Sequence, residues 1–571
     1  MNFHETFDII KRWDKSLIYF RKREGNKGFS LENSRLEEEI MYRVFVLIWI
    51  LLGISVLFAG GEQTEEVQSR SENVRYIRPL HLPDCDPSDP EVVLIRKASD
   101  WKKINRKDKR IFCVAPGNYK SLGAIRITTS GTRSKPRYLI LDNGNREHPA
   151  HLVDDFVDKK TWINDLARYR IKLVGADYWI IDRQAYWNDP NPLHSPLELR
   201  HASHNLLSRA LFVDIAGTVG LYHRSDDNTF QRFHMEKTRW AVDYALRHQP
   251  ENGQPPYEQR IFADLAAFVL VGNRNGVKIR DNRFIANEII NFVDAFQTCR
   301  CGEGYIDDVE GKNPKIDGAG TVVAHNLFYT TPLLYVDEDG TFDESGDRAL
   351  TENALDFKFG SLDPDKPIKI EDNVMFGYRQ TCNVYSDLDD YGYAIVFHYG
   401  AGNIRLKNNV ILDSVYGFGT DGPRGGDPAM YNVRFVHNIF YGIIDHISDI
   451  YGSGERGRYD GSRHVVITRN IFGPMAPGTI SLKAYNARRF IIRNNDFVQS
   501  RPMYFPDGDE QSKNLVIVGN TFYDTREWGI PDYAKRRGNR RAEEAFDWDP
   551  YRHIIHLRRY TRDPVIKSIP F

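Results

Sequence analysis

Apolar and polar residues alternate along the stretch ENALDFKFG, residues 352 to 360. Leu355, Phe357 and Phe359 take every second position, with Asp356 and Lys358 between them. A period of two is typical of a half-buried β-strand, so one face is expected to pack in a core. The other face carries an acid and a base two residues apart. This pair is either a solvated salt pair on an ordinary strand or part of a site that handles charge.

A short unit recurs along the chain, with the order apolar, any, polar, asparagine, any, apolar. It runs from IRDNRF (279–284) to IVGNTF (517–522), and a weaker copy, SDDNTF, lies at 225–230. The repeated asparagines are Asn282, Asn326, Asn373, Asn409, Asn438, Asn470, Asn495 and Asn520. The shortest spacing is 25 residues, which fits one coil of a solenoid. Asparagine tolerates left-handed backbone and forms local hydrogen bonds, so these residues are expected at turns, in a structural role.

Two further stretches, VAPGNY (114–119) and KPRYLIL (135–141), look like the opening coil of such a solenoid. Together with the asparagine repeat, they resemble the right-handed parallel β-helix of the pectate lyase-like superfamily. The resemblance implies an all-β fold, a right-handed parallel β-helix over residues 62–525 with inserted loops. A single coil cannot bury its own apolar face, so the ends need caps. An amphipathic capping helix is expected over 99–110, and a cap or tail over 526–571.

An uncharged apolar run, VFVLIWILLGISVLFA, occupies residues 44–59. If the chain starts at Met41, segment 41–61 is a signal peptide. If it starts at Met1, the run is a membrane anchor behind a cytoplasmic or non-native extension, 1–40. Both alternatives place the rest of the chain in the periplasm, on the cell surface or outside the cell, in contact with the membrane only through this segment. Cys85 and Cys113 can pair in such an oxidising compartment.

The overall charge gives no sign of nucleic acid or a charged membrane surface as the main partner. The formal net charge is −1, so nucleic acid is not an expected partner. Basic runs at 102–110 and 535–541 are interpreted as solvated helix or tail faces. We expect the protein to be a monomer.

Three strands that precede asparagine turns can be aligned on their alanines, which are Ala295, Ala354 and Ala394. Equivalent positions of neighbouring coils then form columns on the outer face. One column is Gln297, Asp356 and Val396, and the next is Cys299, Lys358 and His398. Adjacent parallel strands lie about 4.8 Å apart, so Lys358 and His398 are expected to be neighbours.

The superfamily resemblance implies an acidic polysaccharide substrate and a polysaccharide lyase that acts on a uronate by β-elimination. This reaction needs a base for the C5 proton, a cation for the carboxylate and a proton donor for the leaving oxygen. The candidate catalytic residues are Lys358 as the base, His398 beside it, and Arg379. The candidate substrate-binding residues are Arg348, Gln297 and Tyr399. The candidate calcium ligands are Asp294, Glu352 and Asp356, because this hard cation takes carboxylate oxygens.

Other functions remain open on the same fold. A glycoside hydrolase would use converging carboxylates, such as Asp356 with Asp389 or Asp390. A uronan epimerase would use nearly the same groups as a lyase. A non-catalytic glycan-binding solenoid on the cell surface would instead present stacking aromatics. The candidates for that role are Phe376, Tyr378, Tyr391, Tyr393 and Tyr399, although packing in the core is the commoner use of such residues.

Overall fold

The computed structural model describes residues 75–142, 166–191, 193–238, 266–272, 276–299, 316–330, 353–378, 392–398, 400–420, 430–443, 446–450, 462–473, 480–484, 488–499, 501–505, 514–525, 529–542 and 546. All of them belong to one compact unit of the chain. The N-terminal extension and the apolar run at 44–59 lie outside the described residues. Within these ranges, no helix is long and apolar enough to cross a membrane.

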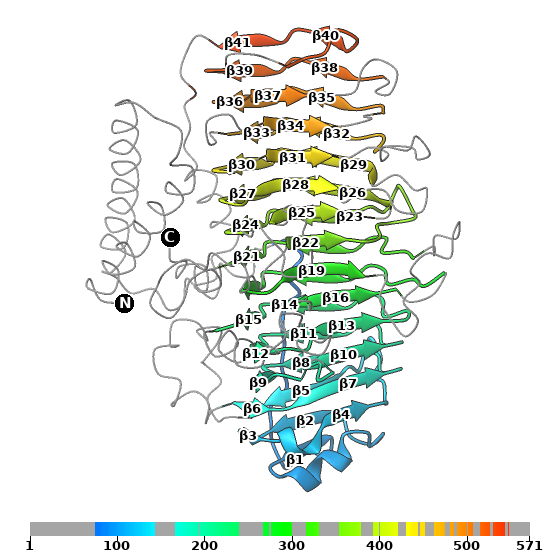
Figure 1. Ribbon diagram of the computed structural model, residues 1–571. Coiled ribbons are helices and arrows are strands. Elements are labelled where there is room, and N and C mark those ends of the chain that lie inside the picture. Colours follow the sequence, from blue (N-terminus) through cyan, green and yellow to red (C-terminus); the bar gives the residue numbers. More distant parts are fainter. Residues whose placement is uncertain are drawn as a thin grey trace, which may run out of the picture. The chain divides into compact units, whose positions relative to one another are not determined.

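Three sheets of 15, 12 and 14 strands make up this unit, here named sheets A, C and B (Figure 1). Successive strands of the chain go to different sheets, so that β22, β23 and β24 belong to sheets C, A and B. Neighbouring strands within each sheet pair in parallel. The predicted all-β fold, a right-handed parallel β-helix, is confirmed.

Sheet A lies on one side of every coil. Its strands are β1 (Val92–Ile95), β2 (Ile111–Val114), β5 (Arg137–Leu141), β8 (Trp179–Asp182), β11 (Leu206–Ser208), β14 (Thr229–Gln231), β17 (Arg283–Ile285), β20 (Val322–Ala324), β23 (Ile368–Glu371), β26 (Ala401–Lys407), β29 (Met430–Val436), β32 (Val466–Thr468), β35 (Ile491–Arg493), β38 (Val516–Val518) and β40 (Lys535–Arg537).

Sheet B follows sheet A in each coil. Its strands are β3 (Gly117–Asn118), β6 (Ala167–Arg168), β9 (Ala185–Asp189), β12 (Leu211–Ile215), β15 (His234–Glu236), β18 (Glu288–Ile290), β21 (Leu327–Tyr329), β24 (Val374–Phe376), β27 (Val410–Leu412), β30 (Ile439–Tyr441), β33 (Ile471–Phe472), β36 (Asp496–Val498), β39 (Thr521–Tyr523) and β41 (Arg540–Ala542).

Sheet C completes the coil and carries the stretch ENALDFKFG. Its strands are β4 (Ala124–Ile127), β7 (Arg170–Val174), β10 (Leu197–Arg200), β13 (Val219–Tyr222), β16 (Phe268–Val271), β19 (Asp294–Cys299), β22 (Asn353–Phe357), β25 (Tyr393–Phe397), β28 (Tyr416–Thr420), β31 (His446–Ile450), β34 (Ile480–Ala484) and β37 (Arg501–Tyr504).

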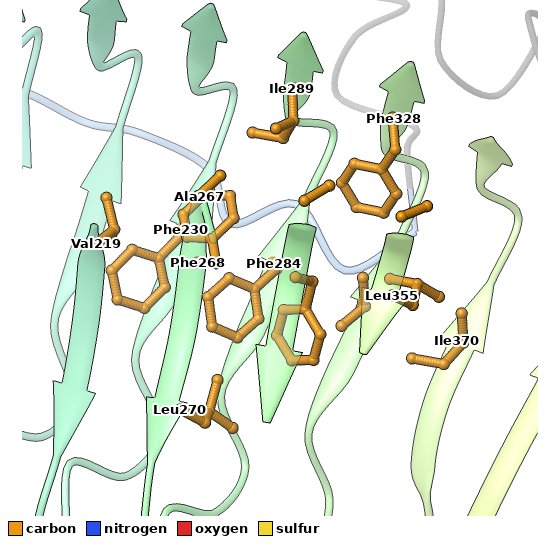
Figure 2. Close-up of a cluster of buried hydrophobic side chains, with 14 of the residues drawn as sticks. Val219, Phe230, Ala267, Phe268, Leu270, Phe284, Ile289, Phe328, Leu355 and Ile370 are labelled. Atoms are coloured by element: carbon orange, nitrogen blue, oxygen red, sulfur yellow. The ribbon is translucent and has the colours of Figure 1, made fainter. Parts of the chain in front are cut away.

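The core is a continuous column of apolar side chains inside the coils. Phe230, Phe284 and Leu355 point into it from different coils, as Figure 2 shows. Like residues stack on like: the ring centroids of Phe230 and Phe284 lie 5.0 Å apart and their planes are nearly parallel. The predicted inward face of ENALDFKFG is confirmed, because Leu355, Phe357 and Phe359 are all buried.

Buried asparagines form two ladders, and one part of the prediction was wrong. The longer ladder lies between sheets A and B and starts at Asn287, which donates its side-chain N–H to Asn326. The predicted members from Asn326 to Asn520 are confirmed, and the ladder continues to Asn539. Asn282 instead belongs to a shorter ladder at the turn between sheets C and A, with Asn205 and Asn228. The repeat IRDNRF therefore matches the later copies in letters but occupies a different turn.

The left-handed backbone is found at the residue before the ladder asparagine. Asn408 has a φ of 57°, and the same position holds His325, Asp372 and His437 in other coils. The ladder asparagine itself is buried and satisfies backbone groups. Asn409 Nδ2 donates to Asn438 Oδ1 and to the carbonyl oxygen of Ile370, each at 2.9 Å.

The ends of the solenoid differ in extent from the prediction. The capping helix is shorter than 99–110: it is a 3-10 helix, η1 (Ala98–Lys103), followed along the chain by a second short one, η2 (Lys120–Leu122). Trp101 of η1 is buried against Tyr119 and Tyr169. At the other end, stacking continues past residue 525. The basic run at 535–541 contributes β40 and most of β41, so it is part of a coil.

An extended segment, residues 75–85, runs along the outside of sheet A. Tyr76 donates its hydroxyl to Glu371 at 2.9 Å, and Arg78 is ion-paired with Asp227 at 2.7 Å. The predicted pairing of Cys85 with Cys113 is confirmed and fixes the segment at the first coils. The segment therefore contacts sheet A at three places: at β2, beside β14 and at β23.

Replacing Asn409 by alanine should destabilise the protein by about 2–4 kcal/mol, because buried backbone groups on two coils lose their partners. The matched control is Asn408→Gly, which keeps the left-handed backbone of the adjacent, partly exposed residue and should change stability by less than about 1 kcal/mol. Urea unfolding monitored by circular dichroism measures both. Equal stability of the two variants would contradict the structural role of the ladder.

Candidate functional site

Three neighbouring strands of sheet C, β19, β22 and β25, bring the predicted columns together. Asp356 pairs with Gln297 on one side and with Val396 on the other, which confirms the alignment made from the alanines. The backbone N–H of Lys358 bonds to Thr298 and that of His398 bonds to Phe357, at 3.0 and 2.8 Å. Lys358 and His398 therefore follow the ends of adjacent strands at equivalent positions.

The carboxylate of Asp356 lies at the centre of this cluster. Its Oδ2 is 2.8 Å from Lys358 Nζ and also accepts a hydrogen bond from Gln297 Nε2 at 2.8 Å. Its Oδ1 is 3.3 Å from His398 Nε2. One carboxylate thus holds an ammonium group and an imidazole side by side.

Burial and charge act on Asp356 in opposite directions. Only 2% of its side chain is exposed, and burial alone would raise its pKa. The charges of Lys358 and His398, together with their hydrogen bonds, outweigh burial and lower the pKa of Asp356 below its usual value. Asp356 is therefore a buried anion at neutral pH, and its interactions with Lys358 and His398 are what keep it ionised.

A chain of amide side chains fixes the position of Asp356 from the other side. Gln297 Nε2 donates to Asp356 and also to Asp294 Oδ2, at 3.1 Å. Asn353 donates to the other oxygen of Asp294 at 3.3 Å. Gln297, Asp294 and Asn353 are all buried. They therefore hold Asp356 in position and do not face solvent themselves.

The structure corrects one feature of the predicted outer face. A solvated strand face was one interpretation of ENALDFKFG, but Asp356 is buried. Lys358 and His398 keep 23% and 12% of their side chains exposed. These two residues are thus the part of the cluster that a ligand can reach, and Asp356 acts behind them.

Calcium was expected at Asp294, Glu352 and Asp356, and the described residues fit it only in part. Asn353 Oδ1 is a buried oxygen with no hydrogen-bond partner among the described residues, as a cation site would have. However, Lys358 and His398 already face the Asp356 carboxylate. In the described part of the chain, no three His, Cys, Asp or Glu side chains are grouped to hold a metal. Because Glu352 lies outside that part, the calcium site stays a prediction.

The remaining candidates cannot be placed. Arg348, Arg379 and Tyr399 lie outside the described residues, as do the acids Asp389 and Asp390 considered for a hydrolase. Tyr391 also lies outside them.

Of the described aromatic candidates, only Tyr393 lies beside the cluster, where it packs with Val396, the register partner of Asp356. Phe376 belongs to sheet B, where it stacks on Tyr329, and Tyr378 is buried. Tyr393 lies on sheet C and stacks on Tyr416 with a centroid distance of 4.5 Å, but both rings are 6% exposed. These rings serve packing between coils.

A second charged cluster, on sheet B, was not identified from the sequence. His234 lies between two carboxylates, with Nδ1 2.8 Å from Glu288 and Nε2 3.3 Å from Glu236. Burial would lower the pKa of His234, but the hydrogen bonds and charges of both glutamates prevail and raise it to about 9. Tyr329 donates to the second oxygen of Glu288. His234 and Glu288 are buried and Glu236 keeps 25% of its side chain exposed, so this cluster joins three coils and meets solvent at Glu236.

Comparison with known proteins gives similarity of structure only. No protein-family model and no curated protein matches the chain. An alginate lyase from Paenibacillus sp. str. FPU-7 is 14% identical over 66% of this chain and 98% of its own, with a TM-score of 0.33. A mannuronic acid specific polysaccharide family 6 lyase from human gut microbiota is 12% identical over 79% of this chain and 82% of its own, with a TM-score of 0.37.

A third similar structure is PfbA, a surface adhesin of Streptococcus pneumoniae. It is 13% identical over 64% of this chain and 82% of its own, with a TM-score of 0.32. Enzymes and an adhesin both occur among these structures, so the similarity selects no activity for this chain.

Removing divalent cations should leave any turnover of a uronate polymer unchanged, because Asp356 is already paired with the ammonium group of Lys358. The protein is dialysed against EDTA, assayed, and assayed again after calcium is added. Loss of turnover that only calcium restores would contradict this expectation and assign the oxygens of Asp294, Asn353 and Asp356 to a metal.

Proposed function

We propose that the chain is a polysaccharide lyase that cleaves a uronic-acid polymer by β-elimination, with Lys358 and His398 meeting the reacting uronate. The observation that carries the proposal is the shared carboxylate. Asp356 holds an ammonium group and an imidazole together on adjacent strands of sheet C, and both remain partly exposed. Elimination needs a cation and a proton-transfer group at neighbouring points, and this pair supplies them.

Lys358 is assigned as the cation of the site. A carboxylate at 2.8 Å favours the charged form of the amine, which makes an ammonium group the resting state of Lys358. This group would pair with the uronate carboxylate and stabilise the negative charge that builds up when C5 loses its proton. The sequence suggested Lys358 as the base, but the ion pair with Asp356 favours Lys358 as the cation and His398 as the base.

His398 is assigned as the base. Its Nε2 faces the Asp356 carboxylate, which can only accept a hydrogen, so the neutral ring carries its lone pair on Nδ1. In the proposed step, His398 takes the C5 proton, the C4–O bond breaks and a C4–C5 double bond forms. The proton then held by His398 is the one that the leaving oxygen requires. An epimerase would instead return a proton to C5.

Exported location and a monomeric state belong to the same proposal. The Cys85–Cys113 disulfide supports an oxidising compartment, and Cys299 is also disulfide-bonded, with a partner outside the described residues. A polysaccharide substrate would be met in such a compartment.

Substitutions at Lys358 and His398 should separate the two roles. Lys358→Met should lower kcat on a uronate polymer by at least about 100-fold, and Lys358→Arg should keep measurable turnover because it restores the cation. His398→Gln should lower kcat by about 10²–10⁴-fold, the usual contribution of a general base. The readout is the ultraviolet absorbance of unsaturated sugar ends.

Lys107→Met, on an exposed loop residue, is the matched control and should have full activity. Thermal unfolding shows that each variant is folded. A folded Lys358→Arg as inactive as Lys358→Met would contradict the role of a cation and restore Lys358 as the base. Conversion of the polymer without unsaturated ends would contradict the lyase and point to an epimerase or a hydrolase.

A further inference from the structure

The outer surface of sheet A changes character along the solenoid. From β2 to β23, the extended segment 75–85 runs along this surface. Its first residues contact Glu371 of β23, through an ion pair from Arg75 and a hydrogen bond from Tyr76. Beyond β23, the pairing register places cations in columns. Lys369, Arg405 and Arg434 pair in succession on β23, β26 and β29, and Glu371 pairs with Lys407.

Further coils add more positive charge. Arg493 and Arg537 occupy the same column as Lys407, through Val436, Thr468 and Val518. Turn residues at both ends of the strands add to it. We name this surface the cationic face. It comprises Arg405, Lys407, Arg434, Arg463, Arg469, Arg488, Arg489, Arg493, Lys535 and Arg537.

The described acidic residues lie at the edge of the cationic face, where Glu371 pairs in register with Lys407 and Asp372 accepts a hydrogen bond from Asn408. The described strands β26, β29, β32, β35, β38 and β40, with the described residues directly next to each, contain no Asp or Glu. Arg434, Arg469, Arg493 and Arg537 are exposed. The excess of positive charge is local to this surface, because the whole chain has a formal net charge of −1.

Two histidines report the positive potential of this surface. Burial lowers the pKa of His437, and the charges of Arg469 and Lys407 lower it further. The pKa of His464 is lowered in the same way by burial and by Arg489 and Arg463. Arg489 also donates to His464 Nε2 at 2.6 Å, which requires that nitrogen to be unprotonated. Both histidines are exposed and lie beside these cations.

We infer that the cationic face binds a linear acidic polysaccharide at a place separate from the candidate site on sheet C. Carboxylates spaced along an extended polymer can pair with cations that repeat every one or more coils, about 4.8 Å per coil. Arginine, which dominates the face, pairs with carboxylates through two parallel hydrogen bonds. The choice of a uronate polymer over another polyanion rests on the proposed function.

The surface suits a sugar chain better than a nucleic acid. Single-stranded nucleic acid binds on aromatic side chains that stack with its bases. The outward positions of β32, β35 and β38 hold Val466, Thr468, Ile491, Arg493, Val516 and Val518, and a single partly exposed ring, Tyr431 of β29, lies beside Arg463, which gives no row of rings for stacked bases among the described residues. A polymer held on sheet A would raise the local concentration of its other segments at sheet C, as tethered sites do.

Reversing charge on the face tests the inference. Arg434→Glu with Arg493→Glu should raise the Kd for long alginate by about tenfold in low salt, since two surface ion pairs are lost and two repulsions added. Added salt should weaken binding to the unmodified protein and narrow the difference. The matched control, Arg133→Glu with Lys135→Glu, makes the same change of charge on an exposed loop before β5 and should leave Kd unchanged.

Each outcome has one interpretation. Equal Kd values for the two double variants, both folded by circular dichroism, would overturn the inference. Tight binding of oligo-dT without binding of alginate would also overturn it, in favour of nucleic acid. Alginate bound at the face with no turnover by any variant would uphold the inference while refuting the lyase. Turnover of short oligosaccharides unaffected by Arg434→Glu with Arg493→Glu, alongside weaker binding of the polymer, would uphold both.

Discussion

In-register stacking of parallel strands is the constraint on which every other feature of this molecule depends. Each coil is too short to bury its own apolar residues, so Phe230 and Phe284 form a core only by lying above one another. The asparagine ladder holds that register, because each side chain binds the next coil and a backbone carbonyl. A shift of one residue would turn every inward side chain outward.

The same register creates the candidate site. Gln297 and Asp356 are 59 residues apart in sequence, yet lie beside each other because their strands pair. Two buried carboxylates, Asp294 and Asp356, are tolerated because amides and cations satisfy them, which is the usual condition for burying charge. Lys358 and His398 are the only members of this network that retain notable exposure among the residues described. The buried residues hold Asp356 in position, and Lys358 and His398 remain accessible to a ligand, so the arrangement is suited to catalysis.

Much of this could be predicted from the sequence, and the failures have physical reasons. Period-two alternation and the repeat of asparagines gave the fold, and the alignment on Ala354 gave the pairing of Asp356. The place of Asn282 was mistaken because a hexapeptide pattern does not distinguish two turns of one coil. The roles of Lys358 and His398 depend on their distances to one carboxylate, which the sequence does not contain. The His234 cluster is built from residues of three coils, which no local stretch of sequence brings together. The basic run at 535–541 resembled a tail because its strands are short and exposed.

Two outer surfaces with different chemistry emerge on one solenoid: a compact charged cluster on sheet C and a broad cationic face on sheet A. The central claim is that a uronate is recognised at Lys358 and His398. A crystal structure of the His398→Gln protein soaked with a uronate oligosaccharide tests it most directly. The account predicts a sugar carboxylate within hydrogen-bond distance of Lys358 Nζ, with C5 directed at residue 398. An oligosaccharide bound only elsewhere, with no sugar carboxylate near Lys358, would contradict it.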